Sequence, residues 1–292
     1  MSQLLDMLTL PFLACLMLGG ILAYCGMHVL KREIIFIDIS LAQVAAVGAI
    51  IAQLAFGAHP ETWPSYAASL VCVFLLAAFC AVLRKGIIRI PIEAVIGVSY
   101  AIAAAAAVFL ISLAPTEIHA EQMLAGSLLW INRSDLVLGF VIFAATGCCF
   151  YVLRKPLLQI SESYRDGLAS GWKAGRWDFV FYVLVGVVIT TAVRLAGVIV
   201  VFAFLIIPAT VSALLASSWP ARMLIAWTAA TIASIAGLLF AYYLDFSFGP
   251  AIVLFLGLVL IIAALVTKIR FTGRIVRTIA PQPPASQFSK VD

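Results

Sequence analysis

Long apolar segments recur along this chain and fill most of its length. They fall at residues 7–30, 34–56, 62–83, 94–114, 136–153, 179–193, 195–216, 223–244 and 248–267. A helix needs about 20 such residues to cross the hydrocarbon core of a bilayer. The sequence therefore predicts an all-α, polytopic membrane protein with eight or nine transmembrane helices.

The amino-acid composition indicates that this fold is surrounded by lipid rather than by water. Apolar residues make up 65% of the 292 residues and charged residues only 11%, whereas soluble domains average about 45–50% and about 25%. The chain cannot cover its core with polar surface, so membrane lipid must surround it. A soluble enzyme, a nucleic-acid binder and a disordered regulator are excluded.

Basic residues set the expected topology. They cluster at residues 31–32, 84–89, 154–176 and 268–277. Because cytoplasmic loops carry an excess of Lys and Arg, this pattern favours nine spans with the N-terminus outside. An eight-span alternative makes 195–221 a surface-lying turn and puts the N-terminus inside. Both place the C-terminal end and the loop at 219–222 in the cytoplasm.

The segments predict one transmembrane domain at residues 1–270, in which about 195–222 is a candidate contact segment for a partner. Residues 271–292 contain Pro281, Pro283 and Pro284 and predict a short disordered cytoplasmic tail. The cysteines lie inside apolar segments and predict packing positions rather than disulfides.

Catalytic motifs are missing from the sequence. The chain has no Gly-Lys dipeptide, which a phosphate-binding loop of the Walker type requires, and no His-Glu-x-x-His, Gly-x-Ser-x-Gly or Cys-x-x-Cys. We therefore expect no enzyme activity and no bound cofactor. If the protein moves a solute uphill, another chain supplies the energy.

The second apolar segment is the most informative, because it contains Asp38, Ser40 and Gln43. A carboxylate inside a spanning helix costs at least about 2.5–3.5 kcal/mol near the bilayer centre and marks a pathway or an ion pair. At about 100° per residue, Ser40 and Gln43 point within about 60° of each other, while Asp38 is about 140° from Gln43. One helix therefore cannot wrap all three around an ion. The alternative is that Asp38 pairs with Lys31, Arg32 or a backbone amide.

Another carboxylate, Glu93, opens the fourth segment after Pro91. It is either a solvated residue favoured by the helix dipole or a further pathway or gating group. The loop sequence Glu117-Ile-His119-Ala-Glu121 has ligand-type side chains but is typical of a solvated acidic loop.

The chain from Arg194 to Arg222 contains Pro208 and a short polar link. Proline breaks the helix, and the link returns directly into another span, which predicts a handle for a cytoplasmic partner. The alternative is a simple Pro-kinked span, which lipid tolerates. The candidate coupling residues are Pro208, Ser217, Ser218, Trp219 and Arg222.

The order of these motifs resembles the permease subunits of the zinc, manganese and iron family of ABC importers. The matching stretches are Gly20 to Gly48 with Asp38, Glu93 to Gly97, Leu124 to Trp130, Trp177 to Tyr182, and Arg194 to Ala209.

The resemblance implies a type II importer fold and a homodimer with a central metal pathway in the cytoplasmic (inner) membrane. A separate cytoplasmic ATP-binding subunit would drive it, and an extracytoplasmic binding protein would deliver the metal. It also implies a cytoplasmic coupling element after Arg194, which favours eight spans.

One departure bears on the metal. The family commonly carries Asp-x-x-Ser-His in the second span, but here the histidine position falls on Ala42, followed by Gln43. Carboxylate and amide oxygens are harder ligands than imidazole, which favours Mn²⁺ or Fe²⁺ over Zn²⁺.

Three other functions stay open. A permease for a chelated metal (siderophore, haem or cobalamin) generally has about ten spans and a longer chain. A carrier driven by an ion gradient would need inverted repeats and buried ionisable residues in both halves, and the second half offers only Asp245 near a span end. A scaffold without transport is the third.

Overall fold

A computed structural model describes residues 2–57, 62–83, 92–113, 128, 131–162 and 172–279. These residues form ten α-helices and contain no strand. The helices are α1 (Ser2–Lys31), α2 (Ile37–Phe56), α3 (Trp63–Leu83), α4 (Ile92–Ser112), α6 (Arg133–Val152), α7 (Arg154–Glu162), α9 (Trp172–Ala196), α10 (Val198–Leu215), α11 (Trp219–Leu244) and α12 (Phe248–Ile279).

Nine of the described helices, all except α7, are long and apolar enough to cross a membrane. Each falls on one of the predicted segments, with ends that differ by a few residues. The all-α polytopic fold is therefore confirmed. Helix α12 continues to Ile279, past the boundary at which a tail was expected.

The eight-span alternative is wrong for the segment after Arg194. Residues 198–215 form α10, whose side chains are largely buried, rather than a surface-lying turn. A sharp turn at Gly197 separates α10 from α9, and its φ of 83° lies in the region that only glycine enters without strain. The two short apolar segments are therefore two separate helices.

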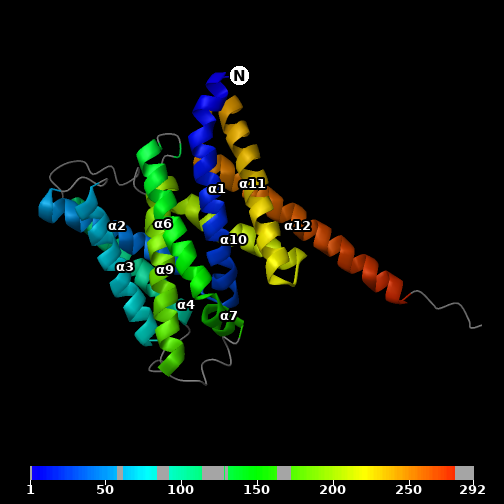
Figure 1. Ribbon diagram of the computed structural model, residues 1–292, viewed down its shortest axis with the longest axis horizontal. Coiled ribbons are helices and arrows are strands. Elements are labelled where there is room, and N and C mark those ends of the chain that lie inside the picture. The colour runs from blue at the N-terminus through cyan, green and yellow to red at the C-terminus, as the bar shows by residue number, and fades with distance from the viewer. Residues whose placement is uncertain are drawn as a thin grey trace, which may run out of the picture.

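The helices form two groups (Figure 1). Helices α2, α3 and α4 pack together on one side, and α1, α10 and α11 pack on the other. Helix α9 contacts both groups, and α6 packs against it. Helix α12 packs against α10 and α11 and then diverges from the bundle toward the C-terminus.

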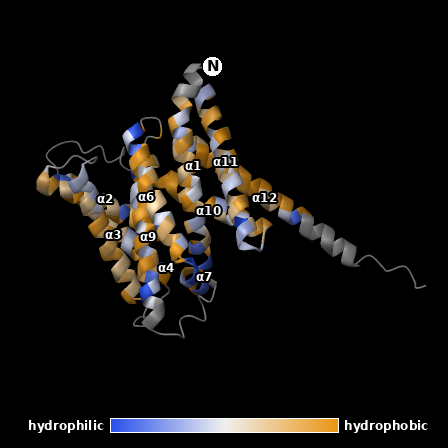
Figure 2. Ribbon diagram, in the orientation of Figure 1, coloured by the Kyte–Doolittle hydropathy of each residue, from blue (hydrophilic) through white to orange (hydrophobic). Residues whose placement is uncertain are grey.

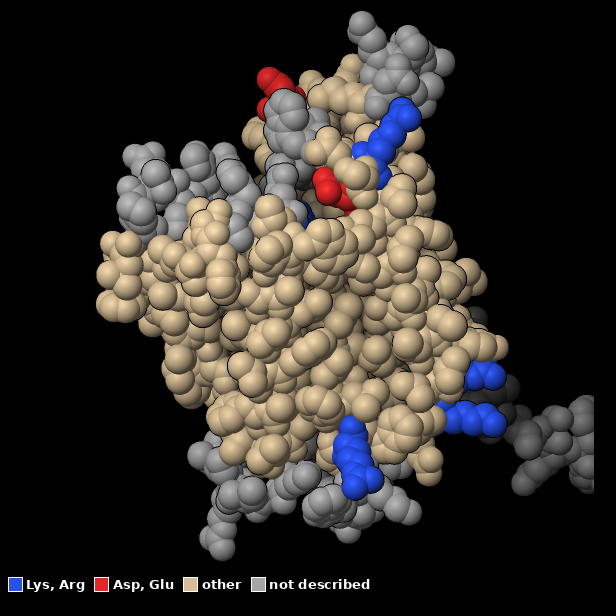
Figure 3. Space-filling model, turned by 60° about the vertical axis from the view of Figure 1, so that its left-hand side comes forward, with Lys and Arg blue, Asp and Glu red and all other residues tan. Residues whose placement is uncertain are grey.

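Charge is confined to the ends of the bundle. Apolar residues cover the helices along most of their length (Figure 2). On the face in Figure 3, a broad band without charged side chains separates those at the upper and lower margins. This band is the surface that the hydrocarbon core of a bilayer requires.

One end of the bundle, which we term the basic end, is defined by contacts between helix termini. There the end of α1 contacts α7, the first turns of α9 and the first residue of α11. Its basic side chains include those of Lys31, Arg154, Lys155, Arg176 and Arg222. From the positive-inside rule we expect this end in the cytoplasm and the start of α1 outside. The basic cluster at 84–89 lies outside the described residues.

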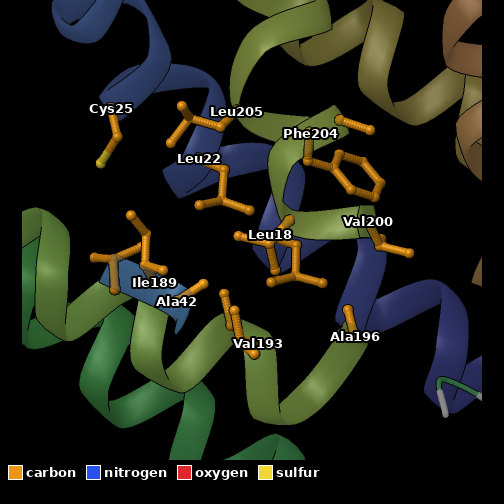
Figure 4. Close-up of a cluster of buried hydrophobic side chains, with 14 of the residues drawn as sticks. Leu18, Leu22, Cys25, Ala42, Ile189, Val193, Ala196, Val200, Phe204 and Leu205 are labelled. Atoms are coloured by element: carbon orange, nitrogen blue, oxygen red, sulfur yellow. The ribbon is translucent and has the colours of Figure 1, made fainter. Parts of the chain in front are cut away.

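The two groups meet in a core built from α1, α2, α9 and α10 (Figure 4). It includes Leu18, Leu22, Ala42, Ile189 and Phe204, all 1% exposed or less. Helices in a bilayer gain little free energy by moving apolar side chains out of lipid, because lipid is as apolar as the protein core. Close approach of the helix backbones therefore stabilises the packing. At Gly26 a β-carbon would lie 1.8 Å from the carbonyl oxygen of Leu205 on α10.

This approach predicts the effect of adding one methyl group to α1. Gly26→Ala should lower the free energy of unfolding by about 1–3 kcal/mol, because α1 and α10 must move apart. Gly20→Ala, on the same helix with nothing within 4 Å of its β-carbon, is the matched control and should unfold like the wild type. Thermal unfolding in detergent measures both; equal midpoints for the two variants would contradict this packing.

Candidate metal pathway and coupling segment

The link between α1 and α2 decides where Asp38 lies. Helix α1 ends in a Schellman motif, in which the amide of Glu33 donates to the carbonyl of Leu30 and that of Ile34 to Val29. Glu33 takes the left-handed conformation, with φ 56°, and the chain turns directly into α2. Asp38 therefore lies in the first turn of α2.

Asp38 is buried, with 2% of its surface exposed. Neither carboxylate oxygen bonds to another side chain among the described residues, and the nearby donors are the amides of Asp38 and Ile39 at the helix start. Those amides and the positive end of the helix dipole favour a carboxylate there. The basic partners that the sequence offered are engaged elsewhere: Arg32 pairs with Asp178, and Lys31 lies over Trp219.

Ser40 and Gln43 do not complete a site around Asp38. Ser40 is fully buried, and its hydroxyl has no hydrogen-bond partner among the described residues. Gln43 is half-buried. All three residues lie on one regular helix, so the angles expected from the sequence hold. The described part of the chain contains no group of three or more His, Cys, Asp and Glu that could hold a metal.

Glu93 lies near the same junction. It is half-buried in the first turn of α4, and its Oε1 accepts a hydrogen bond from the amide of Ile35 at 3.4 Å. The prediction of a solvated Glu93 did not include this contact. The contact connects α4 to the link that precedes Asp38. The loop residues Glu117, His119 and Glu121 lie outside the described residues.

The link between α10 and α11, which belongs to the predicted coupling segment, lies at the basic end. Pro208 is buried inside α10, so a partner protein has no access to its side chain in this structure. Ser217 and Ser218 are exposed in the link between α10 and α11. Arg222 closes this link, because its Nε donates to the carbonyl oxygen of Ala216 at 2.9 Å.

Sequence reasoning missed a buried polar group next to this link, which we term the Arg32 cluster. Arg32 and Asp178 are both fully buried and form an ion pair at 2.8 Å. Its members are His28, Arg32, Ser161, Asp178 and Phe181. Arg32 and Asp178 lie at the edges of apolar segments, which could have marked them as candidate functional residues. The sequence does not reveal that they pair, because they are 146 positions apart.

The whole architecture matches a known class of transport protein. The model of the ABC 3 transport family matches residues 5–267, so the chain belongs to that family. Its described helices and apolar surface agree with a multi-pass protein of the inner membrane.

Individual relatives are similar over most of the chain. A Haemophilus influenzae protein named "Probable iron transport system membrane protein" is 26% identical and covers 90% of this chain and 94% of its own. The manganese import system permease protein ScaB of Streptococcus gordonii is 26% identical over 70% of this chain and 73% of its own. In the solved structure of PsaBC from Streptococcus pneumoniae in complex with Fab, one chain has the same fold, with a TM-score of 0.74 at 22% identity, covering 90% of this chain and 94% of that one.

The two buried aspartates differ in their partners, which predicts opposite effects on stability. Asp178→Asn breaks a buried ion pair and should lower the free energy of unfolding by about 3–5 kcal/mol. Asp38→Asn removes a buried carboxylate that no side chain in the described part of the chain neutralises, so the free energy of unfolding should stay equal or rise. Thermal unfolding of both variants in detergent measures this difference, and a loss at Asp38 as large as at Asp178 would contradict the described surroundings.

Proposed function

We propose that this chain is the membrane-spanning subunit of an ATP-driven importer for a divalent metal ion. Membership of the ABC 3 transport family and the iron and manganese systems named for the relatives support this function. The observation that carries it is Asp38, a buried carboxylate in a spanning helix that no side chain of the described residues neutralises. Such a group marks an ion pathway in membrane proteins.

The metal is proposed to pass Asp38 as cargo, with no resident metal or cofactor in the chain. One carboxylate supplies too few ligands for a divalent ion, so further oxygens must come from a second helix or a second copy. A homodimer that brings two copies of Asp38 to one pathway meets this need. Asp38 is buried in the structure described here, so the proposal requires a further conformation in which the metal reaches it.

Manganese or ferrous iron is the proposed cargo. Position 42 carries a buried alanine where the resembled family has histidine, and Gln43 offers an amide oxygen. Oxygen ligands suit these ions better than they suit zinc. A permease for a chelated metal is the second candidate, but nine spans are fewer than that class generally has.

Energy is proposed to come from a separate cytoplasmic ATP-binding subunit, because the sequence contains no nucleotide-binding motif. Its docking site is the exposed link with Ser217, Ser218 and Trp219, closed by Arg222, at the basic end. An extracytoplasmic binding protein is proposed to deliver the metal at the opposite end.

The pathway is tested by metal uptake into liposomes that contain the assembled complex and ATP. The wild type should import Mn²⁺ and Fe²⁺ faster than Zn²⁺, and Asp38→Asn should slow import at least about tenfold, because the metal loses a charged ligand. Asp135→Asn is the matched control, since Asp135 also lies in the first turn of a spanning helix but is exposed. Unchanged import by Asp38→Asn rules out this pathway, and import without ATP in an ion gradient indicates a secondary carrier.

The docking site is tested by binding of the ATP-binding subunit to the detergent-solubilised chain. Arg222→Ala removes the hydrogen bond that closes the link, so binding should weaken by about tenfold, the effect of about 1.4 kcal/mol. Arg154→Ala removes an exposed charge elsewhere at the basic end and should bind like the wild type. If both variants bind equally well, the subunit docks elsewhere.

A further inference from the structure

The Arg32 cluster joins three elements through one side chain. Arg32 is the C-cap residue of α1; its Nη1 donates to Asp178 on α9 at 2.8 Å and its Nε to Ser161 on α7 at 2.9 Å. The guanidinium carbon lies 3.9 Å from the ring centre of Phe181 on α9. A planar guanidinium can make these contacts at once, which a lysine ammonium cannot.

The same cluster touches the coupling segment. The His28 ring lies 2.9 Å, through Nδ1, from the Ser161 hydroxyl that Arg32 contacts. Its ring centre is 5.0 Å from that of Trp219, and the Lys31 ammonium lies 4.8 Å from the same Trp219 ring. A displacement of Trp219 must therefore move the last turn of α1 or break these contacts.

The cluster also precedes Asp38 directly. Between Arg32 and α2 the chain is held by the Schellman bonds of Glu33 and Ile34 and by the contact of Ile35 with Glu93. Ile34 and Ile37 are fully buried, so the link has little room to flex. A shift of Arg32 is thus carried into the first turn of α2, which contains Asp38.

Stability alone does not account for an ion pair at this position. A buried ion pair contributes little more to folding than well-packed apolar side chains of similar size, because both charges lose their hydration. What such a pair provides is a fixed arrangement of α1 and α9, since breaking it leaves two buried charges. A fixed arrangement of this kind can carry a displacement from one site to another.

We propose that Arg32 is a positioning residue that couples movement of the ATPase-docking link to the Asp38 gate. The path runs from Trp219 through His28 and Lys31 to Arg32, held by Asp178 and Ser161, and then through the α1–α2 link. This inference rests on the proposed function. The inference adds a connection between the docking link and Asp38 through residues that belong to neither site.

The test compares the double variant Arg32→Met, Asp178→Leu with the wild type in the reconstituted complex. The double variant replaces both charges with apolar side chains of similar size, so it should fold and bind the ATP-binding subunit. It should still hydrolyse ATP, but the amount of Mn²⁺ imported per ATP should fall about five- to tenfold or more, the scale of an allosteric coupling. Lys155→Met removes an exposed charge at the same end and should keep the wild-type ratio.

A wild-type ratio of import to hydrolysis in a folded double variant overturns the proposal and makes the pair purely structural. If the double variant does not assemble, Arg32→Lys decides. This variant keeps the positive charge but loses the planar guanidinium and its stacking on Phe181. A reduced ratio of Mn²⁺ import to ATP hydrolysis supports the proposal, and an unchanged ratio overturns it.

Two further samples separate this inference from the proposed function. If the wild-type complex imports no metal, both fail. If the wild type imports Mn²⁺ and Asp38→Asn does not, while the Arg32 and Asp178 variants keep the wild-type ratio, the pathway stands and only the Arg32 coupling fails.

Discussion

Lipid as solvent is the constraint on which this structure depends. The bilayer core offers no water to polar groups, so each must find a partner inside the protein. Hydroxyl groups meet this demand by bonding back to their own helix, as Thr190 does to Gly186 and Ser234 to Ala230. The guanidinium of Arg32 meets it with Asp178 and Ser161. Against this background Asp38 stands out as a buried carboxylate with neither oxygen hydrogen-bonded to a side chain of the described residues, and the proposed pathway rests on it.

Asp38 lies where several elements are fixed by short contacts. The Schellman end of α1 aims the chain into α2, and Glu93 holds the link from α4. The link between α10 and α11, which is the proposed docking site, reaches the same region through Trp219. In the proposed function the Asp38 pathway and the docking site therefore lie close together, and the proposed coupling through the buried contacts around Arg32 is short.

Hydropathy predicted the helical fold well. The apolar segments predicted the nine helices of spanning length among the described residues to within a few residues at most ends, and the basic residues 31–32 and 154–155 lie together at the end where α1 terminates. The eight-span alternative, which the resemblance favoured, expected a surface-lying turn at residues 195–221, where Gly197 lets a buried helix begin. Hydropathy also began the second segment at residue 34, whereas α2 begins at Ile37, because the five residues before α2 form a turn that hydropathy does not reveal. The Arg32–Asp178 pair depends on tertiary packing of helices far apart in sequence, which no single-sequence pattern encodes.

The most direct test of the metal pathway is a structure of the assembled complex trapped with Mn²⁺ and measured at the manganese absorption edge. The account predicts an anomalous peak within coordination distance of the Asp38 carboxylate, with further oxygen ligands from a second helix or from a second copy of the chain. A peak remote from Asp38, with that side chain still enclosed as it is here, would contradict it.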